Sequence, residues 1–237
     1  MEHPVLVLLH GYLGFSHYGP IRYFRGIASA LHQIERPCLS PTVPPAGTIA
    51  ERAESLAQQL FQSDIPAFSL LAHSMGGLDA RYLIRYLDPD CRVKRLVTVG
   101  TPHAGTPVAT WFLESPQLFP AWIRRIGTPG LCELTPATRL AAPIPDREDV
   151  EYYSYAGSRP LNELPFWLRP FGRMIPTDND GLVAVESAQW GKYCGTIRAD
   201  HFEFIGWSFD LPNSRIARPF DHINFWIQAV KGAENDK

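Results

Sequence analysis

Continuous apolar runs alternate with amphipathic segments along the first part of the chain. The runs at residues 5–9, 67–72 and 93–100 have the composition expected of strands buried on both faces of a sheet. Between them, apolar residues recur at helical spacing over residues 19–35, after Thr48, and over residues 75–87, with a short β-like stretch at 37–43. Thr48 and Glu51 form a capping box at the start of the second predicted helix. Strands and helices in this order predict a parallel sheet with right-handed crossovers.

The second half of the chain has a less regular pattern because prolines are concentrated in it. Residues 102–176 hold 12 of the 22 prolines, which excludes long helices over much of this region. We expect a strand at 152–157, a helical segment at 183–191, a last strand at 193–198 and a closing helix at 220–231. We interpret residues 106–145 as a cap inserted over the sheet, since long insertions in compact domains are usually functional lids. An irregular loop region is the alternative.

Length and composition indicate one ordinary globular domain. A chain of 237 residues with 45% hydrophobic and 19% charged residues can bury one substantial core. The net charge of -2 comes without any basic block, so we expect no nucleic-acid partner. No apolar run approaches the roughly 18 residues of a membrane span, so we expect no transmembrane segment. The first four residues lack the features of a signal peptide, which favours a cytoplasmic protein, or a secreted one whose signal peptide has been removed.

The cysteines do not form a recognisable metal or redox motif. Cys38, Cys91, Cys132 and Cys194 are widely spaced and include no CxxC pair. We expect free thiols, and one disulfide remains the alternative if the protein is exported.

The segment AHSMGG at residues 72–77 lies between a predicted strand and a predicted helix. A serine hydroxyl becomes a nucleophile when a nearby base removes its proton. A sharp strand-to-helix turn projects the Ser74 hydroxyl from the sheet and places the helix N-terminus beneath a developing oxyanion. Ala72 and Gly76 supply the small residues that such a turn needs two positions before and after the serine. The alternative is a structural turn in which Ser74 caps the helix.

A second glycine-containing turn, HGYLGF at residues 10–15, directly follows the first predicted strand. Its glycines allow the chain to turn toward the nucleophile, so that a backbone N–H can face the oxyanion together with the N–H of Met75. An ordinary strand-ending turn is the alternative.

Five segments together resemble the bacterial triacylglycerol lipases of the Pseudomonas, Burkholderia and Proteus type. They are HGYLGF at 10–15, YFRGIASAL at 23–31, AHSMGG at 72–77, TPHAG at 101–105 and NDGLV at 179–183. The AHSMGG segment also resembles that of the small Bacillus lipases. The resemblance implies an α/β-hydrolase fold, with a mostly parallel central sheet, helices on both faces and a Pro-rich cap insertion. It also implies that the backbone N–H groups of Tyr12 and Met75 form the oxyanion hole.

The acid and the base follow the serine in the order serine, acid, histidine in this fold. Asp180 matches the catalytic acid of the NDGLV segment; Asp178 in the same loop, or a purely turn-forming role for both, stays open. Two histidines lie beyond this loop, His201, which is 21 residues after Asp180, and His222. We expect His201 to be the base, because the gap fits one helix, one strand and a short loop. His222 begins the last predicted helix, where a surface or capping role is expected. The earlier histidines His10, His73 and His103 are expected to be supporting polar residues of the site.

Metal and cofactor chemistry is not expected. The larger lipases of this group carry a structural calcium near the catalytic histidine, with ligands two and six residues beyond it. These positions hold Glu203 and Trp207 in place of the expected Asp and Gln, and no upstream partner Asp is evident. The chain also lacks a phosphate-binding loop, a dinucleotide-binding glycine pattern and an HExxH motif.

These residues predict a serine carboxylic-ester hydrolase, a lipase or esterase that forms an acyl-enzyme on Ser74. A thioesterase or acyltransferase with the same triad, and a non-catalytic binding protein of this fold, are the alternatives. Aromatic residues near the expected cleft are predicted to bind a small-molecule or lipid ester, with transient contact at a lipid interface; a role in the core is the alternative. They are Phe15, Tyr18, Trp111, Phe112 and Phe119.

Overall fold

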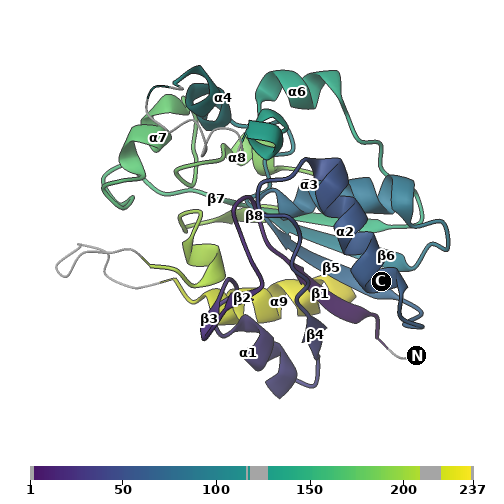
Figure 1. Ribbon diagram of the computed structural model, residues 1–237. Coiled ribbons are helices and arrows are strands. Elements are labelled where there is room, and N and C mark those ends of the chain that lie inside the picture. The colour runs from purple at the N-terminus through teal and green to yellow at the C-terminus, as the bar shows by residue number, and fades with distance from the viewer. Residues whose placement is uncertain (1–2, 116, 118–127, 209–219, 236–237) are drawn as a thin grey trace.

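The computed structural model describes residues 3–115, 117, 128–208 and 220–235. Its centre is a six-stranded sheet in the order β4-β1-β5-β6-β7-β8, in which every neighbouring pair is parallel. In that order the strands are Cys38–Leu39, Val5–Leu9, Phe68–His73, Val93–Val99, Glu151–Gly157 and Lys192–Ile197. The predicted α/β fold with a mostly parallel sheet is confirmed (Figure 1).

Helices cover both faces of the sheet because its central strands are apolar on both sides. In β1, Leu6 and Leu8 belong to one buried cluster, which also contains Trp226 of α9 (His222–Asn235) and residues of α1 (Ile27–Gln33). The alternate residues Val7 and Leu9 belong to a second cluster with α2 (Ile49–Phe61). Figure 1 shows α1 and α9 together on one side of the sheet and α2 and α3 (Gly76–Tyr82) on the other.

The helix boundaries follow local signals only where these signals are strong. Thr48 Oγ1 accepts the N–H of Glu51 at 3.2 Å and Glu51 Oε2 accepts the N–H of Thr48 at 2.8 Å, so the predicted capping box is present at α2. The predicted helix at 75–87 is divided into α3 and the π-helix η1 (Leu83–Leu87). The segment predicted as helical at 183–191 contains only the short α8 (Val185–Ala188).

The prediction of one helix over residues 19–35 was wrong in its first part. Residues 17–22 form a small antiparallel ribbon of β2 (His17–Tyr18) and β3 (Ile21–Arg22). Gly19 and Gly26 have φ angles of 58° and 72°, in the left-handed region that a continuous helix cannot contain. Helix α1 therefore begins only after Gly26.

The Pro-rich region contains short helices that begin at prolines. Pro107 and Pro136 open α4 (Pro107–Glu114) and α6 (Pro136–Ala141), and α7 (Arg169–Met174) has Pro170 in its first turn. Thr106 and Thr135 cap α4 and α6 through their side chains. All three helices lie together at one end of the molecule, at the top of Figure 1.

None of the helices in the described ranges is long and apolar enough to cross a membrane.

Candidate active site

Ser74 lies in a sharp turn between β5 and α3. Its φ angle is 56°, its N–H donates to the carbonyl of Val99 at 3.0 Å, and its carbonyl accepts the hydroxyl of Thr101 at 2.8 Å. The surrounding backbone is so close that side chains are excluded. A Cβ on Gly76 would lie 2.7 Å from the carbonyl oxygen of Leu9, and a Cβ on Gly11 would lie 2.7 Å from Ser74 Cβ.

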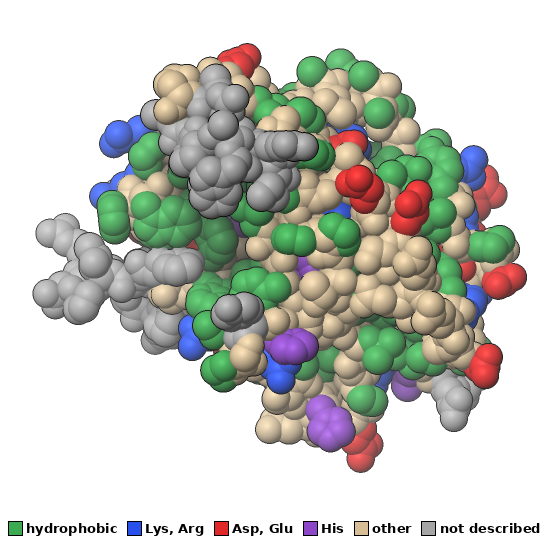
Figure 2. All heavy atoms as spheres, in the orientation of Figure 1, with side chains coloured by type: hydrophobic (Ala, Val, Ile, Leu, Met, Phe, Trp, Pro, Cys, Tyr) green, Lys and Arg blue, Asp and Glu red, His purple; other side chains and the backbone are tan. Residues whose placement is uncertain are grey.

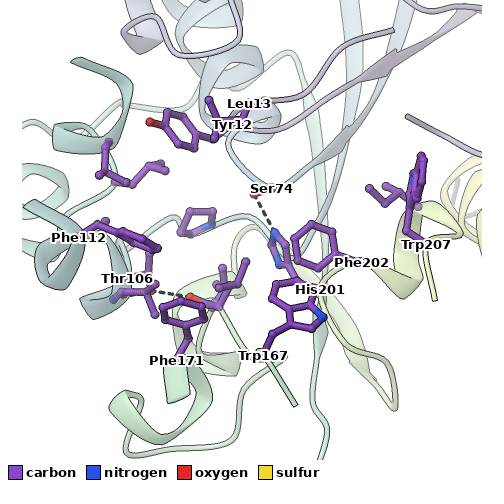
Figure 3. Close-up of a pocket in the computed structure, with 18 of the residues that line it drawn as sticks. Tyr12, Leu13, Ser74, Thr106, Phe112, Trp167, Phe171, His201, Phe202 and Trp207 are labelled. Atoms are coloured by element: carbon purple, nitrogen blue, oxygen red, sulfur yellow. Dashed lines mark hydrogen bonds between the residues drawn. The ribbon is translucent and has the colours of Figure 1, made fainter. Parts of the chain in front are cut away.

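His201 and Asp180 lie in line with the Ser74 hydroxyl. His201 Nε2 is 3.0 Å from Ser74 Oγ, and His201 Nδ1 is 2.7 Å from Asp180 Oδ2 (Figure 3). Asp180 is fully buried, and its other oxygen accepts the N–H groups of Leu182 and Val183 at 2.9 and 2.7 Å. A carboxylate can only accept, so Nδ1 carries the proton and Nε2 faces the Ser74 hydroxyl as an acceptor.

The three residues come from segments that follow β5, β7 and β8 of the same sheet. Asp180 precedes α8 and His201 follows β8, and the N–H of His201 donates to the carbonyl of Asp180 at 3.0 Å. Gly100, directly after β6, leaves room for the side chains of Asp180 and His201. A Cβ at Gly100 would lie 3.2 Å from Asp180 Oδ2 and 3.4 Å from His201 Nδ1. The parallel sheet thus gathers the group at the carboxyl ends of its strands.

The alternative acid and base lie elsewhere. Asp178 lines a separate polar cavity with Asn179 and Arg159. His222 Nε2 donates to the carbonyl of Arg25 at 2.8 Å, at the start of α9. The structure therefore brings together Ser74, Asp180 and His201 and leaves the other two candidates outside the group.

His73, directly before Ser74, is part of a buried chain of hydrogen bonds. The N–H of Gly11 donates to the Tyr23 hydroxyl at 3.0 Å, and that hydroxyl donates to His73 Nδ1 at 2.8 Å. His73 Nε2 donates to the carbonyl of His201 at 2.9 Å. Burial and the neighbouring His201 hold the pKa of His73 well below 6.5. A neutral His73 thus connects the turn at Gly11 to the backbone of the histidine loop.

His10 and His103 are also neutral buried supports. His10 Nδ1 donates to the carbonyl of Gly11 at 3.0 Å, and Nε2 accepts the N–H of Val43 at 3.1 Å. Burial lowers the pKa of His10 to about 4. His103 Nε2 lies 3.2 Å from Thr98 Oγ1, and burial, followed by the charge of Arg81, holds the pKa of His103 well below 6.5.

Arg52 supports the turn that contains Gly11, and it was not identified from the sequence. Its guanidinium is fully buried and donates to the carbonyls of His10 and Gly11 at 2.9 and 3.2 Å and to that of Pro44 at 2.8 Å. Asp79 Oδ2 accepts from Arg52 Nε at 2.8 Å. A signal was available, because Arg52 lies on the otherwise apolar face of α2 that is buried in the protein.

The predicted oxyanion donors lie on either side of Ser74. Tyr12 follows Gly11 and lines the cavity beside Ser74, while Met75 is fully buried at the N-terminus of α3. Figure 3 shows Tyr12 and Leu13 beside Ser74, on the side of the cavity opposite Trp167.

An apolar cavity of about 670 Å³ opens beside Ser74 and His201. Of the predicted substrate-binding residues, Phe15 and Phe112 line it. Trp111 is not among the described lining residues and instead packs on Phe112, with ring centroids 5.0 Å apart. Phe119 and the side chain of Tyr18 lie outside the described residues.

Several lining residues were not identified from the sequence. They include Leu131, Trp167, Phe171, Leu182, Phe202 and Trp207. Most belong to segments after the predicted cap, so only the fold shows that they line the cavity beside Ser74. Figure 3 labels Trp167, Phe171, Phe202 and Trp207 among them. In the space-filling view, hydrophobic side chains border a hollow below α7 (Figure 2).

The two positions compared with calcium ligands are engaged in other contacts. Both carboxylate oxygens of Glu203 accept from Arg159, at 2.8 and 2.7 Å. Trp207 Nε1 donates to the carbonyl of Tyr23 at 2.9 Å. Within the described ranges, no cluster of three or more His, Cys, Asp or Glu side chains could hold a metal ion. The four cysteines are unpaired, with Cys38 half-buried and the others exposed.

The chain is similar to lipases and esterases in sequence and in fold. It is 28% identical over 251 aligned positions to triacylglycerol lipase 2 of Saccharomyces cerevisiae, covering 88% of this chain and 72% of the yeast protein. It is 30% identical over 112 positions to the triacylglycerol lipase of Pseudomonas fragi, covering 46% of this chain and 37% of that protein. The structure of a metagenomic carboxyl esterase superposes with a TM-score of 0.75 and 21% identity, covering 98% of this chain and 76% of that one.

No protein-family model matches the chain. The resemblance to lipases and esterases and the α/β-hydrolase fold, both predicted from short segments, are confirmed by these similarities.

Proposed function

We propose that Ser74 is the nucleophile with which this α/β-hydrolase of the lipase and esterase type cleaves carboxylic esters. The observation that carries the proposal is the alignment of Asp180, His201 and Ser74, with separations of 2.7 and 3.0 Å. Each ring nitrogen of His201 has one partner, so the imidazole is oriented to accept the serine proton.

The reaction follows from this alignment. Ser74 Oγ attacks the ester carbonyl carbon as its proton passes to His201 Nε2, and the Nδ1–H bond to Asp180 stabilises the imidazolium. The N–H groups of Tyr12 and Met75 bind the oxyanion of the tetrahedral intermediate. His201 then returns the proton to the leaving alcohol, and water hydrolyses the acyl-enzyme by the same steps.

The substrate proposed is an ester with a sizeable apolar acyl group, including lipid esters. A cavity of about 670 Å³ lies within the range of sites for drug-sized ligands, and its lining is mostly aliphatic and aromatic. We also propose that residues 106–145 form a cap over this cavity and make transient contact with a lipid surface. The enzyme is proposed to act in the cytoplasm or as a secreted protein.

The test is hydrolysis of p-nitrophenyl esters from C2 to C16 and of an emulsified triglyceride. The wild-type chain should hydrolyse these esters and react with a fluorophosphonate probe, and Ser74→Ala should lose both reactions while remaining folded. Probe labelling that persists in Ser74→Ala would show that another residue is the nucleophile. Faster turnover of acyl thioesters, or acyl transfer to added alcohols in preference to water, would instead identify a thioesterase or acyltransferase.

A further inference from the structure

The loop that carries His201 contains a buried carboxylate that ester hydrolysis does not use. Glu203 lies two residues beyond His201, at the start of the 3-10 helix η3 (Glu203–Ile205), and is 4% exposed. Its Oε2 accepts the N–H of Asp200 at 2.7 Å, and Asp200 Oδ1 accepts the N–H groups of Phe202 and Glu203 at 2.8 and 3.0 Å. These two acidic side chains therefore fix the backbone on both sides of His201.

Arg159 neutralises Glu203 from a distant part of the chain. It follows β7 and is 6% exposed, and its Nε and Nη2 donate to the two oxygens of Glu203 at 2.8 and 2.7 Å. Two parallel charged hydrogen bonds of this kind fix direction as well as distance. Its third nitrogen, Nη1, donates to Glu163 at 3.2 Å.

The main chain of Arg159 is bonded to the loop that carries the acid. Its N–H donates to the carbonyl of Asn179 at 3.0 Å, next to Asp180. Arg159 therefore contacts the acid loop through its backbone and the histidine loop through its side chain. These loops hold the two residues whose relative placement orients the imidazole.

We propose that Arg159 is a positioning residue whose guanidinium clamps Glu203 and thereby holds the His201 ring between Ser74 and Asp180. The role of the clamp in catalysis rests on the proposed function. Burial, followed by the nearby Glu203 carboxylate, raises the pKa of Asp200 to about 7. Arg159 is the buried cation that pairs with Glu203 in this acidic loop.

The main test uses a charge-neutral pair of substitutions. Arg159→Met alone leaves Glu203 as an uncompensated buried charge and is expected to impair folding. The double variant Arg159→Met/Glu203→Met removes both charges and is expected to fold. Its kcat should fall by roughly 100-fold, as for small misplacements of catalytic groups, with KM unchanged within about twofold.

Arg198→Met is the matched control. Arg198 is paired with Glu163, which also contacts Arg159, but its own side chain is 69% exposed. This variant removes an arginine from the same local network without opening the clamp. Its kcat should equal that of the wild type.

A pH profile separates this role from a purely structural one. The charged and titratable groups around His201 are Asp180 and His73, which contact it directly, and Asp200, Glu203 and Arg159 in the clamp. Folded Arg159→Met protein loses a cation, so the acid limb of kcat/KM should move to higher pH. Glu203→Gln loses an anion, so the limb should move to lower pH. Loss of stability alone would not shift the two limbs in opposite directions.

The proposal is overturned if the folded double variant keeps kcat within about twofold of wild type, or if both single variants shift the acid limb in the same direction. A readout without turnover is the low-field proton NMR signal of His201 Nδ1–H, which should move or broaden in the double variant and stay unchanged in Arg198→Met. If the wild type cleaves no ester, the proposed function fails, and this signal still tests the clamp. An unchanged signal in the double variant would refute it.

Discussion

At the scale of single residues, the His201 ring has one partner at each nitrogen: Ser74 on one side and Asp180 on the other. His201→Ala should reduce ester hydrolysis about as much as Ser74→Ala, because the members of the proposed triad act as a unit. Asp180→Asn should lower kcat by a factor on the order of 10⁴, since the imidazole then adopts the wrong tautomer. Steady-state kinetics on one p-nitrophenyl ester measures both.

His222→Ala is the control for the base. His222 bonds to a backbone carbonyl at the start of α9, so its loss should change the rate by at most a few-fold. An inactive His222→Ala together with an active His201→Ala would exclude His201 as the base.

Individual site residues differed in how far the sequence could predict them. Ser74 and Asp180 lie in short segments whose residue types are chemically restrictive, whereas His201 was chosen from two histidines by its position after Asp180. The fold brings these three residues together. Tyr23 and Arg52 bind the turn at Gly11 from 12 and 41 residues further along the chain. Tertiary packing decides which backbone group a buried hydroxyl or guanidinium binds. These contacts therefore cannot be predicted from short sequence patterns.

At the scale of elements, α4 and α7 together form one wall of the cavity. Phe112 of α4 and Phe171 of α7 both line it, with ring centroids 5.4 Å apart. Replacing either phenylalanine with Ala should weaken hydrolysis of long acyl esters more than that of acetate. Each buried methylene contributes roughly 0.8 kcal/mol, so the deficit in kcat/KM should grow with chain length.

Leu140→Ala is the control for this series, because Leu140 on α6 is 86% exposed. It should leave the chain-length profile unchanged. Equal losses at all chain lengths for Phe112→Ala and Phe171→Ala would indicate a structural role for these rings.

Strand positions were easier to predict than helix boundaries. Strands buried on both faces are continuous apolar runs, and β1 matches its predicted range. The helical spacing over residues 19–35 was misleading because two glycines with positive φ interrupt it. The prolines after residue 102 showed that this region is irregular. The packing of its short helices over the site could not be predicted from them.

At the scale of the whole molecule, buried neutral histidines link stability to pH. Burial and Arg81 hold the pKa of His103 below 6.5, so the unfolded chain binds this proton more readily than the folded protein. Stability is therefore lost as pH falls below about 6.5, the value for an unperturbed histidine. In His103→Asn this contribution is absent.

The stability difference between wild type and His103→Asn should thus become smaller on going from pH 8 to pH 5, by on the order of 1 kcal/mol. Urea unfolding at several pH values measures it. A difference for His103→Asn that does not change with pH would mean that His103 is protonated equally in both states.

The left-handed backbone of Ser74 sets the catalytic role proposed for this residue against thermodynamic stability. Any residue with a Cβ is strained at a φ of 56°, by roughly 1–2 kcal/mol. Ser74→Gly and Ser74→Ala both lack the hydroxyl, yet the glycine variant should be the more stable by about 1 kcal/mol, the reverse of their order in a helix interior. Thermal unfolding of the two inactive variants measures the difference, and a more stable alanine variant would show that the turn is unstrained. The fold is thus stable in spite of the strained backbone at Ser74, and substitutions that remove the hydroxyl at this one position can favour the folded state.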